Sequence, residues 1–95
     1  MSEALLGEFS KGLGRSTLCV RVLRERGGFV CERVLIESGH KSQVDRTQVL
    51  PFSTLSALQD FLSHDPFYAH AEREVEALLR KVAREVPDVR DDIRL

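Results

Sequence analysis

The spacing of apolar residues in this 95-residue chain changes once, near Pro51, and this change constrains the fold more than any other feature. Before Pro51, apolar and β-branched residues alternate in part with polar ones, as they do in half-buried strands. After Pro51, apolar residues recur every three or four positions, which is typical of helices that pack by one face. A chain of this length can build one hydrophobic core, so we predict a single α+β domain.

Residues 16–50 are predicted to form a three-stranded antiparallel β-meander. The first two strands, residues 17–24 and 29–37, are rich in β-branched side chains. Gly27-Gly28 between them tolerates the positive φ that a tight hairpin turn needs.

The third predicted strand, residues 42–50, is more polar and follows a turn at Ser38-Gly39-His40-Lys41. Pro51 should end it, because proline cannot donate a hydrogen bond to a sheet ladder. Residues 1–15 are interrupted by three glycines, so we predict an N-terminal arm there.

Two helices are predicted within residues 53–86, and they should cover one face of the sheet. Ser53 or Thr54 can cap the first helix, because either hydroxyl can accept from a free backbone N–H group. The first helix should bury one stripe of side chains, formed by Leu55, Leu58, Phe61 and Leu62.

The second helix should begin at Pro66, where a missing backbone donor costs nothing, and end at Val86, before the next proline. Asp65 can cap its start. Residues 87–95 then form a charged tail. The apolar stripe of this helix includes Val75, Leu78, Leu79 and Val82.

Two registers of the first hairpin are open. If Arg26 faces Phe29, Val22 lies opposite Arg33 and Leu18 opposite Glu37. We favour the register in which Arg26 faces Val30, because it collects apolar residues on one face, and burying that face fixes the register. The side chains gathered there are Leu18, Val20, Val22, Val30, Val34 and Ile36.

The opposite face would then carry Arg21, Leu23, Arg33 and Leu35, and we predict that these four residues bind a partner protein. Mixed apolar and cationic surfaces of this kind are enriched where proteins dock. The alternative is a half-exposed face, or one that the N-terminal arm covers.

A homodimer is the second predicted association, and it uses the stripe Val75, Leu78, Leu79 and Val82. Acidic residues come first along this helix and basic residues later, so two antiparallel copies would place opposite charges side by side. The alternative is that the stripe packs on its own sheet.

No pattern of residues indicates catalysis, a cofactor or a metal site, and we expect a protein that is not an enzyme. Asp60 precedes His64 by one helical turn, which favours a local capping contact or a solvent-exposed role rather than a catalytic pair. Cys19 and Cys31 would lie about 20 Å apart on one face, so no disulfide is expected. The chain starts without a signal-peptide pattern and has no membrane-length apolar run, so a cytoplasmic protein is expected.

The alternative function is single-stranded nucleic-acid binding through Arg21, Arg33 and Arg46, with Lys11, Arg15 and Lys41 flanking them. The segments Gly27-Gly28-Phe29-Val30, Lys41-Ser42 and Leu58-Gln59-Asp60-Phe61-Leu62 give residues 17–63 a loose resemblance to one repeat of the PUR family, which binds single-stranded nucleic acid. The chain departs from such a repeat in having three clear strands and a second helix. The function we favour is a small non-catalytic interaction or adaptor module, homodimeric or bound to another protein.

Overall fold

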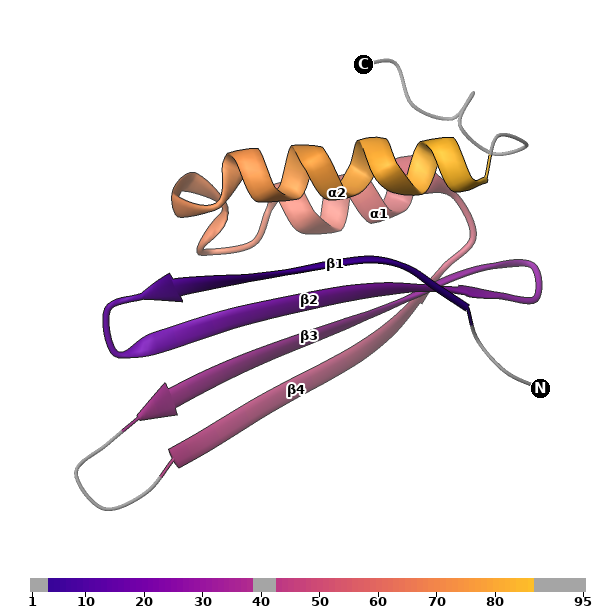
Figure 1. The fold of residues 1–95 in the computed structure, drawn as a ribbon. Coiled ribbons are helices and arrows are strands. Elements are labelled where there is room, and N and C mark those ends of the chain that lie inside the picture. Colours follow the sequence, from indigo (N-terminus) through magenta and orange to yellow (C-terminus); the bar gives the residue numbers. More distant parts are fainter. Residues whose placement is uncertain (1–3, 39–42, 87–95) are drawn as a thin grey trace.

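The computed structural model describes residues 4–38 and 43–86, and it contains one antiparallel sheet with two helices on one side (Figure 1). The strands run in the order β1-β2-β3-β4, so the sheet is a meander. The prediction of an α+β meander followed by two helices is confirmed, with four strands rather than three. The elements are β1 (Ala4–Leu13), β2 (Ser16–Glu25), β3 (Gly28–Ser38), β4 (Gln43–Phe52), α1 (Leu55–Ser63), the short 3₁₀ helix η1 (Tyr68–His70) and α2 (Glu72–Glu85).

The predicted N-terminal arm is wrong, because residues 4–13 form the edge strand β1, paired antiparallel with β2. Its glycines do not break it. Gly7 follows a bulge and lies against α2, where an added Cβ would come within 2.7 Å of Leu78 Cδ1. Gly14 has φ 68° and closes the turn into β2, a conformation that L side chains rarely adopt.

The β2–β3 register differs from both of the registers considered. Glu25 pairs with Gly28, so Arg26 and Gly27 form the turn, with Gly27 at φ 81°. In this register Val22 lies opposite Cys31 and odd-numbered residues of β3 share a face with even-numbered residues of β2. A change of register by an odd number of residues moves every side chain of a strand to the other face.

Two predicted partner-binding residues are therefore placed on the wrong face by the sequence argument. Arg33 and Leu35 face the helices, and Leu35 is buried in the core. Val30, Val34 and Ile36 lie on the opposite face instead. The observed register places Phe29, Cys31 and Leu35 in the core cluster, at 2%, 1% and 8% exposure.

Both helices bury their apolar stripes against the same sheet face. Thr54 caps α1, since its Oγ1 accepts from the backbone N–H of Ala57 at 3.1 Å. The core cluster includes Leu55, Leu58 and Leu62 from α1, and Val75, Leu78, Leu79 and Val82 from α2.

The boundaries of β4 and of the second helix differ from those predicted. β4 continues through Pro51 to Phe52, because an edge strand tolerates a missing donor. Asp65 accepts from the backbone N–H of Phe67 at 2.9 Å, as expected of a cap, but η1 follows and α2 begins only at Glu72. The predicted tail, and most of the turn that contains His40 and Lys41, lie outside the described residues.

Gly28→Ala is expected to destabilise the fold by about 1–3 kcal/mol, because its new Cβ would overlap the carbonyl oxygen of Phe52 on the neighbouring strand. Gly12→Ala is the matched control, since nothing lies within 4 Å of that Cβ. Urea denaturation of both variants measures the difference. Equal midpoints for the two variants would contradict the close packing of Gly28 on β4.

Candidate interaction surfaces

The sheet face opposite the helices has no described element packed on it (Figure 1). We call it the far face. Side chains alternate along each strand, so the registers define its members. They include Leu5, Glu8 and Ser10 in β1, Thr17, Cys19, Arg21 and Leu23 in β2, Val30, Glu32, Val34 and Ile36 in β3, and Thr47, Val49 and Pro51 in β4.

One end of the far face is apolar across all four strands. The apolar row contains one residue from each strand, and each residue pairs with the next one across the neighbouring strand. In strand order they are Leu5, Leu23, Val30 and Pro51. Leu23 and Val30 are buried but lie outside the main core cluster. Leu5 is 45% exposed and Val49, next to the row, is 57% exposed. These are the exposed large apolar side chains among the described residues, and both lie on the far face.

A charged row crosses the sheet beside the apolar row. It consists of the charged residues Glu8, Arg21 and Glu32, and it ends at Val49 in β4. The Arg21 guanidinium lies 3.4 Å from Glu8 Oε1 and 3.3 Å from Glu32 Oε1. Because all three charged side chains are substantially exposed, these pairs add little to stability. They give the centre of the far face a fixed pattern of charge.

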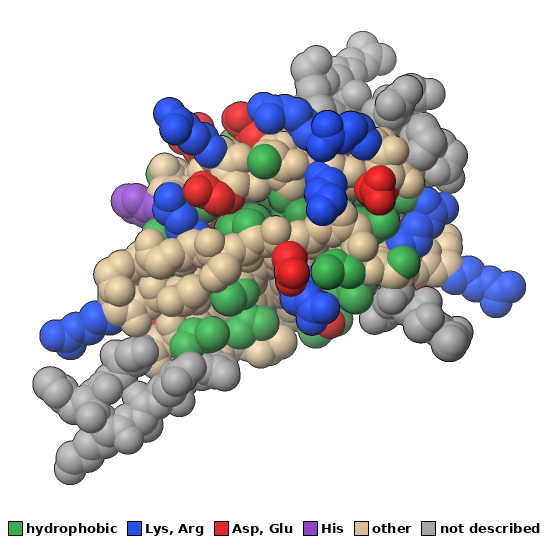
Figure 2. Space-filling view, in the orientation of Figure 1, with side chains coloured by type: hydrophobic (Ala, Val, Ile, Leu, Met, Phe, Trp, Pro, Cys, Tyr) green, Lys and Arg blue, Asp and Glu red, His purple; other side chains and the backbone are tan. Residues whose placement is uncertain are grey.

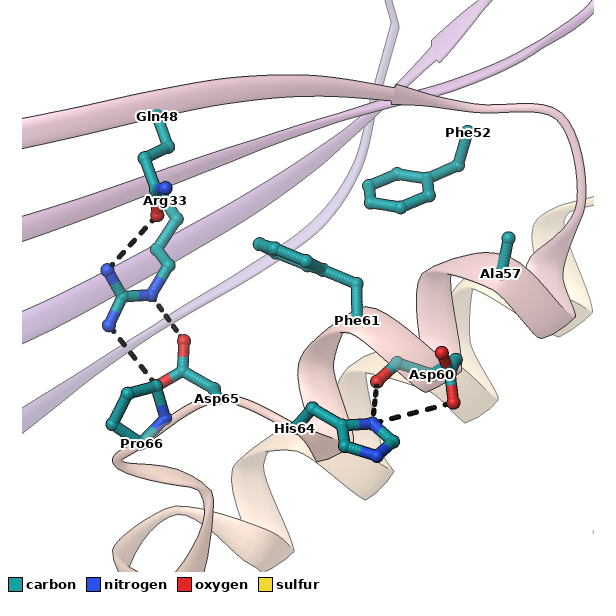
Figure 3. A pocket seen from close by; sticks show the side chains of 9 residues that line it. All are labelled: Arg33, Gln48, Phe52, Ala57, Asp60, Phe61, His64, Asp65 and Pro66. Carbon is teal, nitrogen blue, oxygen red and sulfur yellow. Dashed lines mark hydrogen bonds and ion pairs between the residues drawn. The ribbon is translucent and has the colours of Figure 1, made fainter.

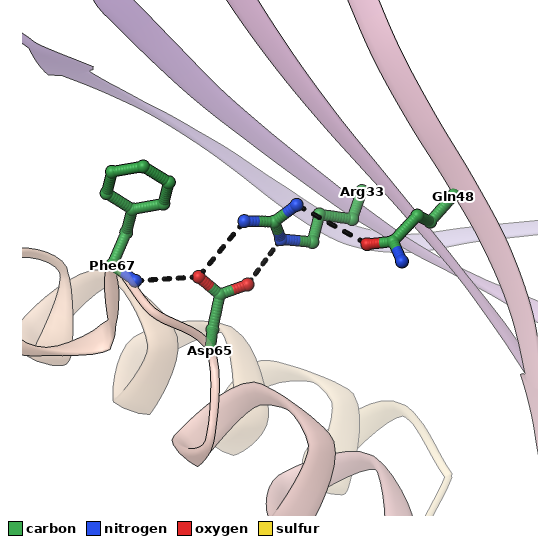
Figure 4. A network of polar contacts seen from close by, with 4 residues as sticks. All are labelled: Arg33, Gln48, Asp65 and Phe67. Carbon is green, nitrogen blue, oxygen red and sulfur yellow. Dashed lines mark hydrogen bonds and ion pairs between the residues drawn. The ribbon is translucent and has the colours of Figure 1, made fainter.

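The opposite side of the sheet holds a polar network around Arg33 (Figure 4). Arg33 donates from Nε to Asp65 Oδ2 and from Nη2 to Asp65 Oδ1 at 3.2 Å, a bidentate arrangement. The side chains of Arg33 and Asp65 are only 11% and 6% exposed. Gln48 accepts from Arg33 Nη1 at 3.4 Å, and the guanidinium carbon lies 6.0 Å from the centre of the Phe67 ring.

This network joins the middle of the sheet to the α1–η1 connection. Asp65 accepts hydrogen bonds both from Arg33 and from the backbone N–H of Phe67. The same carboxylate therefore holds the α1–η1 connection in place and neutralises the charge of Arg33. A buried ion pair is costly to break, since the charge left behind has no partner. The placement of Arg33 here also explains how β3 can turn a cation toward the helices.

A groove of about 700 Å³ adjoins this network, between β4 and α1 (Figure 3). Gln48 and Phe52 line its strand side, and the Arg33–Asp65 pair lies at one end. The ring centres of Phe52 and Phe61 are 5.3 Å apart. The helix side is lined by Ala57, Asp60, Phe61 and His64, and Pro66 completes the lining.

The rim of the groove carries an exposed pair one helical turn apart. His64 Nδ1 lies 3.4 Å from Asp60 Oδ1, and the two side chains are 77% and 78% exposed. His64 Nδ1 is also 2.8 Å from the Asp60 carbonyl oxygen. The predicted local capping contact is confirmed.

The two cysteines lie on opposite faces of the sheet, and both are free. The reason first given for expecting no disulfide, separation along one face, is wrong. Cys19 is on the far face, with its sulfur 3.5 Å from Ser10 Oγ. Burial raises the pKa of the Cys31 thiol to about 12, and Asp65 and Glu32 act in the same direction while Arg33 opposes them.

The structure separates the residues predicted to bind a partner. Arg21 and Leu23 are on the far face, whereas Arg33 and Leu35 are on the helix side. The stripe residues Val75, Leu78, Leu79 and Val82 are at most 4% exposed within the single chain. These four residues therefore pack against the chain's own sheet, which is the alternative that the sequence left open.

The cations named for nucleic-acid binding do not converge on one described surface. Arg33 is paired with Asp65 and is 11% exposed, and Arg46 is on the helix side of β4 with Glu37 as its neighbour. Lys11 lies 3.2 Å from Glu74 of α2. Glu74's own backbone N–H and the Lys11 ammonium hold the pKa of the Glu74 carboxyl below its usual value.

No family model, curated protein or solved structure matches this chain, so no comparison supports the loose resemblance to a PUR repeat. Within residues 4–38 and 43–86, no helix is long and apolar enough to cross a membrane. The same residues contain no cluster of three or more His, Cys, Asp or Glu side chains that could hold a metal ion.

Sequence reasoning missed the Arg33–Asp65 pair and the groove beside it. A signal was present, because a lone arginine within the apolar strand β3 requires a partner when it faces the core. Asp65, next to a proline in a short connection, was identified only as a cap.

Asp65→Ala is expected to destabilise the protein by about 2–4 kcal/mol, because it leaves the largely buried Arg33 charge without a carboxylate. Replacing both residues, as Arg33→Met with Asp65→Leu, should recover most of that loss. Asp60→Ala is the matched control and should change stability by less than about 1 kcal/mol, since its pair is exposed. Thermal and urea unfolding measure all three. A double variant as unstable as Asp65→Ala would contradict the assignment.

In the single folded chain, Cys31 should resist thiol reagents, whereas Cys19 on the far face reacts. With dithiobis(nitrobenzoate) at pH 8, we expect Cys19→Ser to slow labelling at least about tenfold, and Cys31→Ser to leave it unchanged. Because the folded pKa of Cys31 lies above 9.0, its contribution to stability is present below pH 9 and is lost as pH rises toward 12. Fast labelling of Cys19→Ser would show that Cys31 is not buried.

Proposed function

We propose that this protein is a small non-catalytic interaction module, and that it works as a homodimer formed through the far face. The observation that supports this most is the position of Leu5 and Val49, the two exposed large apolar side chains, beside a buried apolar pair on the one sheet face without a helix. The two exposed side chains lie on the edge strands β1 and β4, at either end of this pair, and apolar side chains exposed on one face are a feature of interaction sites. Figure 2 shows exposed apolar side chains over the strands, while charged side chains gather over α2.

The far face has the size of a specific interface. Four strands about 4.8 Å apart and about ten residues long, at about 3.3 Å per residue, span about 600 Å². Two such faces would bury about 1,200 Å², the lower end of the range for stable complexes.

The order of residues on the far face favours a second copy as the occupant. A two-fold axis parallel to the strands, between β2 and β3, lays β2 of one copy over β3 of the other and β1 over β4. Arg21 then faces Glu32 of the second copy, and Leu23 faces its Val30. The apolar rows meet each other, and in the charged row Arg21 meets Glu32 twice by symmetry while Glu8 meets Val49, a self-complementary arrangement of the kind that an isologous interface requires.

Val49→Asp should dissociate the dimer, because Val49 faces Glu8 of the second copy under this axis and the new carboxylate would repel it. Ala77→Asp, at an exposed position of α2, is the matched control and should leave the dimer intact. Sedimentation velocity at 5–50 micromolar, chosen as roughly the range for a moderate dimer, reads out the mass. A wild-type monomer throughout, or equal effects of the two variants, would contradict the proposal.

Arg21→Glu should weaken the dimer at least about tenfold, and the added change Glu32→Arg should restore it, since the pair is then reversed in both copies. Circular dichroism of each variant verifies that the monomer stays folded. Restoration of the fold without restoration of the dimer would show that the two residues pair only within one chain.

A further inference from the structure

The groove between β4 and α1 continues directly into an open sheet edge. β4 is the last strand in the order β1-β2-β3-β4, so within the described residues one side of its backbone has no neighbouring strand. Gln48 and Phe52 of β4 line the groove, and α1 forms the other side (Figure 3). A segment added beside β4 would send every second side chain into this groove.

The two edges of the sheet differ in how they are protected. β1 has a bulge near Leu5, carries charges at Glu8 and Lys11, and is covered by α2 on the helix side. β4 pairs with β3 without a register shift. Thr47–Leu50, between Arg46 and Pro51, carries no charge. Bulges, charges, prolines and covering elements are the devices that keep sheet edges from pairing, and Thr47–Leu50 itself has no bulge, charge or proline, although Arg46 and Pro51 bound it.

The lining of the groove selects a cation. Arg33 neutralises Asp65, which leaves Asp60 as the one uncompensated charge of the lining when histidine is counted as neutral. Phe52 and Phe61 provide aromatic surface within the same groove. A lysine or arginine side chain fits these features, because its methylene stem can lie on the rings while its charged head reaches the exposed Asp60 carboxylate.

We propose that the groove and the free edge of β4 bind an extended peptide segment of a partner protein, which adds a fifth strand and places a lysine or arginine side chain between Phe61 and Asp60. Backbone hydrogen bonds to Thr47–Leu50 provide general affinity, and the basic side chain provides selectivity. The groove is on the helix side of the sheet and the bonding groups are on the β4 edge, so the proposal does not depend on the homodimer, although Thr47 and Val49 also present side chains to the far face.

The test uses the full chain, ¹⁵N-labelled, with a blocked six-residue peptide that alternates threonine and valine around one central lysine. We expect amide shifts at Thr47–Leu50 and Ala57–Phe61, and binding at least about fivefold tighter than that of the same peptide with glutamate in place of lysine. Shifts confined to β1, no shifts at all, or equal binding of the two peptides would overturn the proposal.

Two pairs of variants separate groove binding from general charge attraction. Ala57→Arg should abolish binding by filling the groove, whereas Ser56→Arg, which adds the same charge one residue away outside the lining, should not. Asp60→Asn should remove the preference for lysine, whereas Glu76→Gln, which changes an acid in another exposed i,i+4 pair, should leave it. Equal effects within either pair would overturn the proposal. Shifts at Thr47–Leu50 that follow protein concentration without peptide would assign the edge to a second copy instead.

Discussion

The bidentate pair between Arg33 and Asp65 is the contact on which the relation of sheet to helices depends. Arg33 lies in the middle of β3 and faces the helices, where an unpaired guanidinium would be strongly unfavourable. Asp65 removes that cost, and its other hydrogen bond to Phe67 holds the connection that leads into α2. The Asp65 carboxylate therefore stabilises the β3 register that turns Arg33 toward the helices, and it holds the connection that leads into α2.

The consequences of that register extend to both surfaces of the sheet. With Phe29, Cys31 and Leu35 committed to the core, the β-branched residues Val30, Val34 and Ile36 are left on the far face. The far face thus gains the apolar residues that the helix side does not use. On the helix side, the same pair closes one end of the β4–α1 groove and neutralises its own charge, which leaves Asp60 to set the charge of the lining.

The cations show why composition was a poor guide to a binding surface. Arg21, Arg33 and Arg46 are spread over three strands, and each has an acidic neighbour within 4 Å: Glu32, Asp65 and Glu37. A face that looks basic in the sequence is therefore compensated pair by pair once the strands are aligned. The groove could not have been predicted either, because it joins β3 and β4 to a loop residue, Asp65, that lies far from them in the sequence.

The sequence by itself determined the class of fold, the two helical stripes and a hydroxyl cap at Ser53 or Thr54, because these follow from local spacing and from short-range hydrogen bonding, and the structure uses Thr54. It did not determine that residues 4–13 are a strand, or which face of β3 is buried. The tertiary structure decided both, since β1 exists through its pairing with β2 and through the approach of α2 to Gly7. The buried face of β3 was decided by packing against the helices together with the Arg33–Asp65 pair. Both faces of β3 are partly apolar, so the alternation of residue types does not show which of them is buried.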